Sequence, residues 1–268
     1  MRRVLHLGGG TARRLCVTLG MAGVAWASAL ADEGAEPDRG AQPPHFELWS
    51  GAQGYRHVWA VYSGLSVAPL GSIQQDGLRL RVSGGYGADT YQGPPAAGGG
   101  TGTITYSGAT SFADALIGYH SQLGPLTLKL FAGVAAADRQ ISPDDPAASI
   151  QGLAVGGKVA VETWWNLSER TWTAVDLSWA SLYHTYAARG RLGWRIVPEL
   201  SVGLDAGAVG NVDGDILRVA GFVRYELESG EISLSAGVSN DKVLDGRIDT
   251  ITLGAGSPFA MVSWLTRF

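Results

Sequence analysis

The stretch Ser257–Phe268 reads S-P-F-A-M-V-S-W-L-T-R-F and decides the fold. From Ala260 onward, every second residue belongs to one largely apolar set: Ala260, Val262, Trp264, Thr266 and Phe268. The residues between them form a mixed set: Met261, Ser263, Leu265 and Arg267. Side chains on a β-strand alternate between its two faces. The pattern therefore predicts a strand with one face against an apolar medium.

The chain from Phe46 onward repeats this alternation in segments separated by turn residues. We expect twelve strands, at residues 46–53, 57–68, 77–90, 103–121, 125–137, 149–165, 171–182, 186–197, 199–209, 215–228, 231–240 and 257–267. Many reach the length of about 9–11 residues that crosses a bilayer as a tilted strand. After residue 31 no run of 18 apolar residues exists, so the pattern does not predict transmembrane helices.

Five segments set charged or polar residues against apolar ones. Leu78, Leu80 and Val82, for example, oppose Arg79 and Arg81. The other four segments centre on Leu128, Trp194, Val219 and Leu234. A soluble sandwich would bury its apolar side and carry more Lys and Glu on its surface. The chain is therefore expected to be all-β, a transmembrane antiparallel up-and-down β-barrel of twelve strands.

The N-terminal residues 1–31 have the features of a secretory signal peptide. Four arginines, an apolar stretch and the A-x-A sequence Ala29-Leu30-Ala31 follow one another. Residues 32–45 are expected to be a disordered leader, and residues 46–268 the barrel. Without residues 1–31, Lys+Arg falls from 20 to 16 against 24 acids, a formal charge of −8, which argues against nucleic acid as a partner. Cys16 leaves with the signal, so no disulfide is expected.

The connections and the aromatic residues also indicate a membrane barrel. With both termini in the periplasm, the links 91–102 and 138–148 and the segment after Asn240 face outward, and most inward links are short. The inward link 69–76 is an exception. Two aromatic girdles are expected. Phe46, Trp164, Trp165, Trp172, Trp194, Tyr225, Trp264 and Phe268 collect near the periplasmic ends; Tyr55, Trp59, Tyr86, Tyr91, Tyr106, Trp179, Tyr183 and Tyr186 collect near the outer ends.

Short glycine-rich motifs recur in a particular order along the chain. They are Trp49-Ser50-Gly51, Tyr62-Ser63-Gly64, residues 76–81 with Gly85-Tyr86-Gly87, Ile117-Gly118-Tyr119, residues 143–146, Gly156-Gly157-Lys158, Glu162-Thr163-Trp164, residues 188–193 and a glycine-spaced strand at 203–210. In this order they resemble the cellulose biosynthesis protein BcsS family, over about residues 46–268. The resemblance implies an outer-membrane component that accompanies cellulose synthesis. The terminal strand ending in Phe268 likewise resembles the C-terminal strand of bacterial outer-membrane barrels, which the barrel-assembly machinery reads.

The charged residues on the inner face are the candidate functional site. This lumen charge network comprises Arg79, Arg81, Lys129, Lys158, Glu162, Arg189, Arg191, Arg195, Asp205, Arg218, Arg224 and Glu226. It forms either a polar conduit or saccharide-contacting lumen, or a plug of ion pairs of the kind that fills narrow barrels. We expect the plug, with Glu162 and Glu226 neutralising the wall formed by Arg189, Arg191, Arg218 and Arg224.

Three patterns offer catalytic or metal alternatives. Glu47, Asp114, Glu162 and Asp176 could supply a glycosidase pair, which needs a defined separation. Ser181 and His184 lack an evident third group for a triad. Residues 211–222 begin like a calcium loop but lack its glycine and its final carboxylate. We therefore expect no catalytic residue, no metal and no cofactor.

The sequence predicts a non-enzymatic outer-membrane accessory protein of cellulose biosynthesis or secretion. A small-solute or saccharide pore and an outer-membrane enzyme acting on lipid or glycan remain alternatives. Expected partners are outer-membrane lipid and, by the resemblance, cellulose or components of the cellulose synthase complex.

Overall fold

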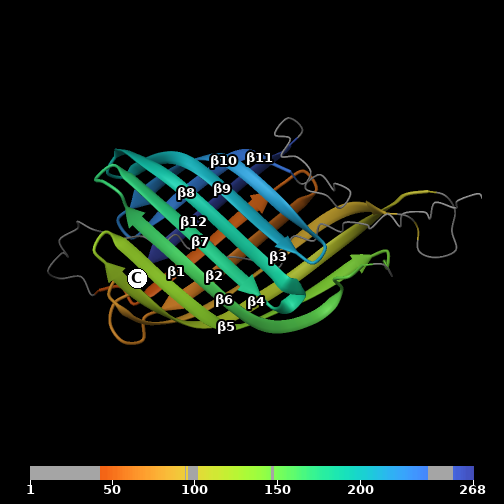
Figure 1. Cartoon of the computed structure of the whole chain (residues 1–268), viewed down its shortest axis with the longest axis horizontal. Helices are drawn as coiled ribbons and strands as arrows, with labels where there is room; N and C mark the ends of the chain where they lie inside the picture. Colours follow the sequence, from red (N-terminus) through yellow and green to blue (C-terminus); the bar gives the residue numbers. More distant parts are fainter. Residues whose placement is uncertain (1–42, 94, 96–101, 146–147, 241–255) are drawn as a thin grey trace, which may run out of the picture.

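The computed structural model describes residues 43–93, 95, 102–145, 148–240 and 256–268. The predicted signal peptide and most of the predicted leader lie outside the described residues. The described part forms twelve strands and one short 3-10 turn, η1 (Leu182–His184) (Figure 1). The strands are β1 (Phe46–Gly54), β2 (Val58–Val67), β3 (Gly77–Gly93), β4 (Ile104–Leu123), β5 (Leu126–Ser142), β6 (Gly152–Asn166), β7 (Thr171–Ala180), β8 (Thr185–Val197), β9 (Leu200–Asn211), β10 (Gly214–Leu227), β11 (Gly230–Ser239) and β12 (Ser257–Arg267).

The strands form one closed antiparallel barrel in which each strand pairs with its neighbours in the chain. The first and last strands complete the circle, with Glu47 opposite Arg267 and Gly54 opposite Ala260. Every strand has a hydrogen-bonded neighbour on both sides, so the closed part of the wall has no strand edge. The predicted twelve-strand up-and-down barrel is confirmed.

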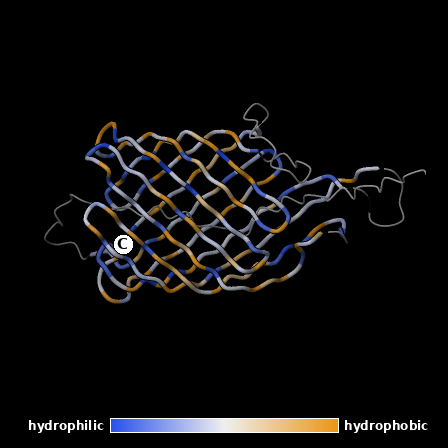
Figure 2. Tube along the Cα trace, viewed as in Figure 1, coloured by the Kyte–Doolittle hydropathy of each residue, from blue (hydrophilic) through white to orange (hydrophobic). Residues whose placement is uncertain are grey.

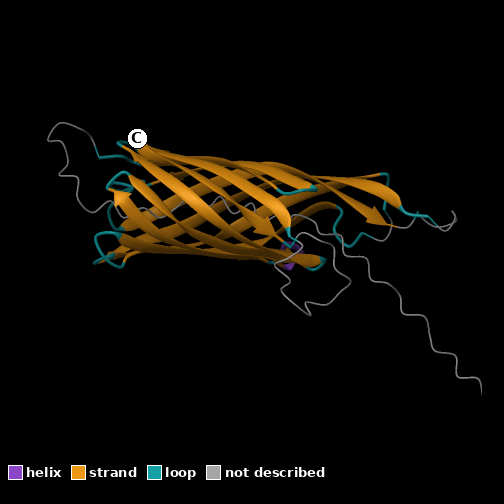
Figure 3. Ribbon diagram, turned by 90° about the horizontal axis from the view of Figure 1, so that it is seen from above, coloured by secondary structure: helices purple, strands orange, loops and turns teal. Residues whose placement is uncertain are grey.

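The two ends of the barrel differ. Phe46 and Phe268 stack at one end, called the terminal end here, with ring centroids 5.5 Å apart. At the opposite, distal end, β3, β4 and β5 project beyond the rest of the wall (Figures 1 and 3). The sequence predicts the end of β5 at residue 137, but the strand continues to Ser142. The run Ala135–Ala137 obscured the alternation, because small side chains are compatible with either face.

The outer surface of the barrel is apolar and the inner surface is polar. Large apolar side chains such as Leu80, Leu192 and Leu234 are 45%, 49% and 57% exposed on the outside. Orange and blue alternate along the strands in Figure 2. An apolar exterior over a closed barrel is what a bilayer requires. No helix among the described residues is long and apolar enough to span a membrane.

Some residues assigned to the predicted aromatic girdles lie inside the barrel and not on its outer surface. Trp165, Trp194 and Trp264 are exposed on the outside near the terminal end, and Trp59 and Trp179 near the distal end. By contrast, Trp164, Trp172, Tyr91 and Tyr106 are buried within the barrel. The sequence analysis sorted these residues by strand end and overlooked their parity: Trp164 shares a face with Glu162, two residues away.

Six inward aromatic rings each lie over a glycine on the neighbouring strand. A Cβ atom at each of these glycines would overlap the ring. The register places every pair directly opposite: Trp49 with Gly64, Tyr62 with Gly51, Phe112 with Gly85, Phe131 with Gly118, Trp172 with Gly193 and Phe222 with Gly203. The glycines therefore give the rings room to lie flat on the wall, which accounts for part of the chain's high glycine content.

Substitution of Gly193 tests this packing. Gly193→Ala should destabilise the barrel by about 1–3 kcal/mol, because the new methyl group forces the Trp172 ring off the wall. Gly190→Ala, on the same strand, is the matched control, since its Cβ would meet nothing within 4 Å. Urea unfolding of the barrel in lipid vesicles measures both. Equal effects of the two substitutions would contradict the packing account.

Candidate functional site

The lumen contains the charged side chains that the sequence predicts there. Ten of the twelve residues of the lumen charge network are buried, and Arg195 and Glu226 are half-buried. They come from six strands, β3, β5, β6, β8, β9 and β10, because alternate positions of each strand face inward. Most of these charged side chains have a protein partner.

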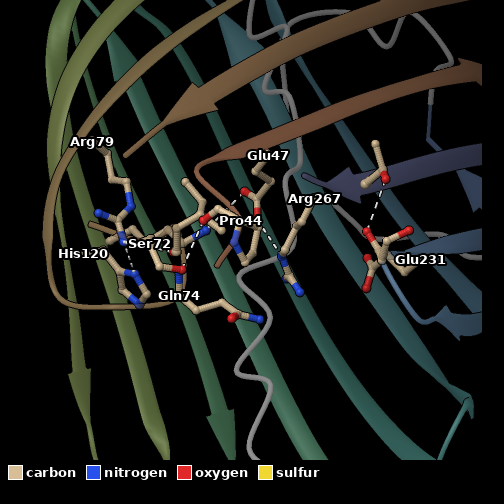
Figure 4. Close-up of polar contacts among 12 residues, drawn as sticks. Pro44, Glu47, Ser72, Gln74, Arg79, His120, Glu231 and Arg267 are labelled. Atoms are coloured by element: carbon tan, nitrogen blue, oxygen red, sulfur yellow. Dashed lines mark hydrogen bonds and ion pairs between the residues drawn. The ribbon is translucent and has the colours of Figure 1, made fainter. Parts of the chain in front are cut away.

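A first layer of ion pairs lies at the terminal end. Glu47 accepts hydrogen bonds from Lys129 Nζ and Arg267 Nε, both at 3.3 Å (Figure 4). Arg224 pairs with both Glu226 and Glu231. Glu47 and Glu231 are each 3% exposed or less, so these carboxylates act inside the barrel and not on its rim. Ion pairs so enclosed are screened far less by salt than surface pairs.

The unusual link between β2 and β3 folds over this same end. Arg79 donates hydrogen bonds to the carbonyl oxygens of Ser72 at 3.1 Å and Ile73 at 2.9 Å. Its guanidinium also lies 2.8 Å from His120 Nδ1 (Figure 4). The backbone N–H of Ile73 and the hydroxyl of Ser72 both donate to the carbonyl of Pro44, at 2.7 and 3.1 Å. Ser72 and Ile73 are thus held by Arg79 on one side and by Pro44 on the other, which gives the long inward link a structural role.

A second layer occupies the middle of the lumen. Arg81 on β3 pairs with Glu162 on β6, across the interior of the barrel. Lys158 pairs with Asp114, which also accepts a hydrogen bond from Ser83 at 2.7 Å. A hydrogen-bonded pair of this kind compensates for the loss of hydration of both charges.

Asp176 differs from the other lumen acids. It lies directly opposite Glu162 on β6 and Arg189 on β8 and is 2% exposed. Neither carboxylate oxygen accepts a hydrogen bond from the described part of the chain. Because Glu162 is bonded to Arg81 and Arg189 to Asp205, Asp176 makes no hydrogen bond to either of the residues opposite it.

A third layer lies toward the distal end. Arg189 Nε donates to Asp205 at 2.9 Å. Arg218 donates to the side chains of Gln53 at 3.0 Å and Tyr55 at 3.3 Å. The expected neutralisation of the arginine wall is therefore distributed differently from the prediction: Glu226 does pair with Arg224, whereas Glu162 pairs with Arg81 and Asp205 pairs with Arg189.

Aromatic rings fill the space between the charges. Trp164 and Trp172 stack with centroids 4.0 Å apart, and the Arg224 guanidinium lies over both, 5.0 and 5.4 Å from their centroids. Arg81 lies in the same way over Trp49 at 4.9 Å and over Phe131 at 5.1 Å. A guanidinium stacked on a ring face gains cation–π energy that increases when water is excluded. Charge and aromatic packing thus occupy the lumen together.

The predicted network lacks the ion pair between Arg139 and Asp89, and it also lacks Glu231 and Arg267. Arg139 forms a two-pronged pair with Asp89, at 2.7 and 3.0 Å, and also donates to Thr110. Arg139 lies beyond the predicted end of its strand, so its face was not assigned. Asp89 does share the parity of Arg79 and Arg81, and that signal could have placed it inside.

Most residues of the catalytic alternatives have bonding or packing partners of their own. Of the four carboxylates, Glu47, Asp114 and Glu162 are each bonded to a cation. The hydroxyl of Ser181 accepts a hydrogen bond from the backbone N–H of Gly157 at 2.9 Å. His184 packs against Trp179, with ring centroids 6.4 Å apart. Among the described residues, no group of three His, Cys, Asp or Glu side chains is placed to hold a metal ion.

Comparisons with known proteins give a family and several solved barrels. The model of the family "Cellulose biosynthesis protein BcsS" matches residues 47–265. A comparison with curated proteins gave no match. Three solved structures are similar to this chain at low sequence identity. They are the translocator domain of the autotransporter NalP from Neisseria meningitidis (11% identity, TM-score 0.45, 85% of this chain and 90% of that one), the transport unit of the autotransporter AIDA-I from Escherichia coli (10%, 0.44, 92% and 96%) and the KdgM porin (8%, 0.40, 83% and 99%). The fold assignment itself rests on the strand register.

The mid-lumen pair gives a direct test of the site. Glu162→Gln should destabilise the barrel by about 3–5 kcal/mol, because Arg81 then stays buried without its anion. Asp176→Asn is the matched control on the opposing strand, and it should cost less than about 1 kcal/mol because no hydrogen bond is lost. Urea unfolding in vesicles compares the two. A larger loss for Asp176→Asn would contradict the assigned pairing.

Proposed function

The chain belongs to the cellulose biosynthesis protein BcsS family, and from this premise we propose that it is an outer-membrane accessory protein of cellulose biosynthesis or secretion that neither catalyses nor conducts. The observation that carries the proposal is the set of buried ion pairs in the lumen, two of which join strands that are not neighbours, β3 with β6 and β4 with β6. The family match supports a role in cellulose biosynthesis, and the paired charges in the lumen support a role without catalysis or conduction.

The proposed location is the outer membrane, reached through the predicted signal peptide. The apolar exterior and the closed antiparallel barrel support it, since a closed barrel is one of the two structures that can span a bilayer. The terminal end, with its short hairpins, then faces the periplasm, and the projecting strands β3–β5 face outward. Outer-membrane lipid covers the wall, while cellulose or components of its synthase complex are the proposed partners at the two ends.

A non-conducting role follows from the interior contacts. A pore for ions or saccharides needs a continuous aqueous path, whereas the Arg81–Glu162 pair joins β3 to β6 within the lumen and Arg79 holds Ser72 and Ile73 at the terminal end. An enzyme needs reactive groups free to meet a substrate, whereas three of the four candidate carboxylates are bonded to cations. The barrel is therefore proposed to act through its two exposed ends.

A gene deletion tests this function. Loss of the protein should reduce the cellulose that reaches the cell surface, and the wild-type gene and the Gly190→Ala control should both restore it. Fractionation should place the protein in the outer membrane, with migration on a gel that changes on heating. Unchanged cellulose in the deletion strain, or recovery of the protein from the soluble periplasm, would overturn the proposal. Turnover of a lipid or glycan by the purified barrel would favour an enzyme instead.

A further inference from the structure

The projecting sheet at the distal end has two free edges. On one side, the pairing of β2 with β3 ends at Val58 and Asp89. On the other, the pairing of β7 with β6 ends at Ala180 and Lys158. Among the described residues, no strand pairs beyond these points on the outer sides of β3 and β6, while β3, β4, β5 and β6 remain paired to one another (Figures 1 and 3). The segment 152–156 is called the β6 edge below.

Backbone hydrogen-bonding groups on the β6 edge point away from β5. The carbonyl of Gly157 accepts from the backbone N–H of Ser181 at 2.8 Å, and its N–H donates to the Ser181 hydroxyl at 2.9 Å. In an antiparallel ladder, alternate residues direct both groups to the same side. Val155 and Leu153, two and four residues away, therefore also direct their N–H and C=O groups to the free side.

The side chains of the β6 edge are apolar and lie above the membrane girdle. Leu153 is 73% exposed and Val155 is 68% exposed. Val159 lies opposite Trp179 of the outer girdle. At a rise of about 3.3 Å per residue and a tilt of about 40°, Val155 lies about 10 Å and Leu153 about 15 Å farther out. Acyl chains do not reach that height, so lipid does not account for these two residues.

The free edge of β3 carries polar side chains, which disfavour pairing with another strand. The exposed side chains on the free end of β3 are Thr90 and Gln92, which are polar. Natural proteins blunt sheet edges with polar or charged residues, since a bare apolar edge pairs with other strands. The contrast within one sheet shows that the β6 edge lacks a protection that the β3 edge has.

From these observations we propose that the β6 edge binds an extended polypeptide segment of another protein, which adds as a strand beside Leu153 and Val155. Four backbone groups in strand spacing match the backbone of a further strand, and the alternate apolar side chains supply contacts for small or apolar residues of the partner. The turn that contains η1 contacts β6 at both ends of the β6 edge. Ser181 contacts Gly157, and Tyr183 donates to the carbonyl of Gly152 at 3.4 Å, so the added segment is short.

A second copy of the chain does not fit this site. Barrel strands tilt by about 40° from the membrane normal, all in the same sense around the barrel. The facing walls of two neighbouring barrels therefore tilt in opposite directions, and their strands cross at about 80°. Paired strands differ by only about 20–25°. The partner must approach as a flexible segment, which a rigid barrel cannot supply from its wall.

A peptide probe tests the proposal on the intact barrel in lipid nanodiscs. The probe is a fluorescent peptide of alternating threonine and valine, and its control has the same sequence with methylated backbone nitrogens. The probe should bind the wild-type barrel, and the methylated peptide should not. Val155→Pro should weaken binding about tenfold, because proline removes one edge donor. Proline is tolerated where the N–H faces solvent, and heat-modifiable migration verifies the fold.

The matched control is Gln92→Pro on the β3 edge, which should bind the probe as the wild type does. Val155→Lys provides a second variant, since a charge blocks strand addition without changing the backbone. The proposal is overturned if the wild-type barrel does not bind the probe, if the methylated peptide binds equally well, or if both Val155 variants bind like the wild type. Soluble glucan oligomers that bind in place of the peptide would instead assign the edge to a glycan.

Discussion

An arginine side chain enclosed by twelve strands must find an anion, a carbonyl oxygen or a ring face, because a buried charge without a partner costs several kcal/mol. The interior of this barrel meets that requirement in three ways. Arg81 and Arg189 have carboxylates, Arg79 has backbone carbonyls, and Arg224 has both carboxylates and tryptophan rings. The positions of these partners determine which strands are held together across the lumen.

The aromatic rings that contact the arginines need room on the barrel wall. The Trp172 ring lies flat on the wall because the neighbouring strand carries glycine, at Gly193, where a Cβ atom would overlap the ring. The Trp172–Gly193 pair, the Trp164–Trp172 stack and Arg224 form one such unit. Because side chains alternate between the two faces, each strand supplies both the apolar outer surface and part of the interior packing.

The sequence predicted the number of strands, their neighbours and the inward face of most charged residues, because a period of two residues is a local signal. It could not predict which charges meet. Arg81 and Glu162 lie 81 residues apart and come together only through the curvature of the wall between β3 and β6. The role of residues 68–76 was likewise hidden, because it depends on Arg79 reaching backbone carbonyls and not a charged partner. The free edge of β6 follows from unequal strand lengths, and those lengths were the least certain part of the prediction.

We propose that the side chains of the barrel itself close its lumen. Recording from the purified wild-type barrel in a planar bilayer tests it most directly. The contacts between Arg81 and Glu162, Lys158 and Asp114, and Arg79 and residues 72–75 predict no steady conductance. A large, steady conductance through the wild-type protein would contradict the account.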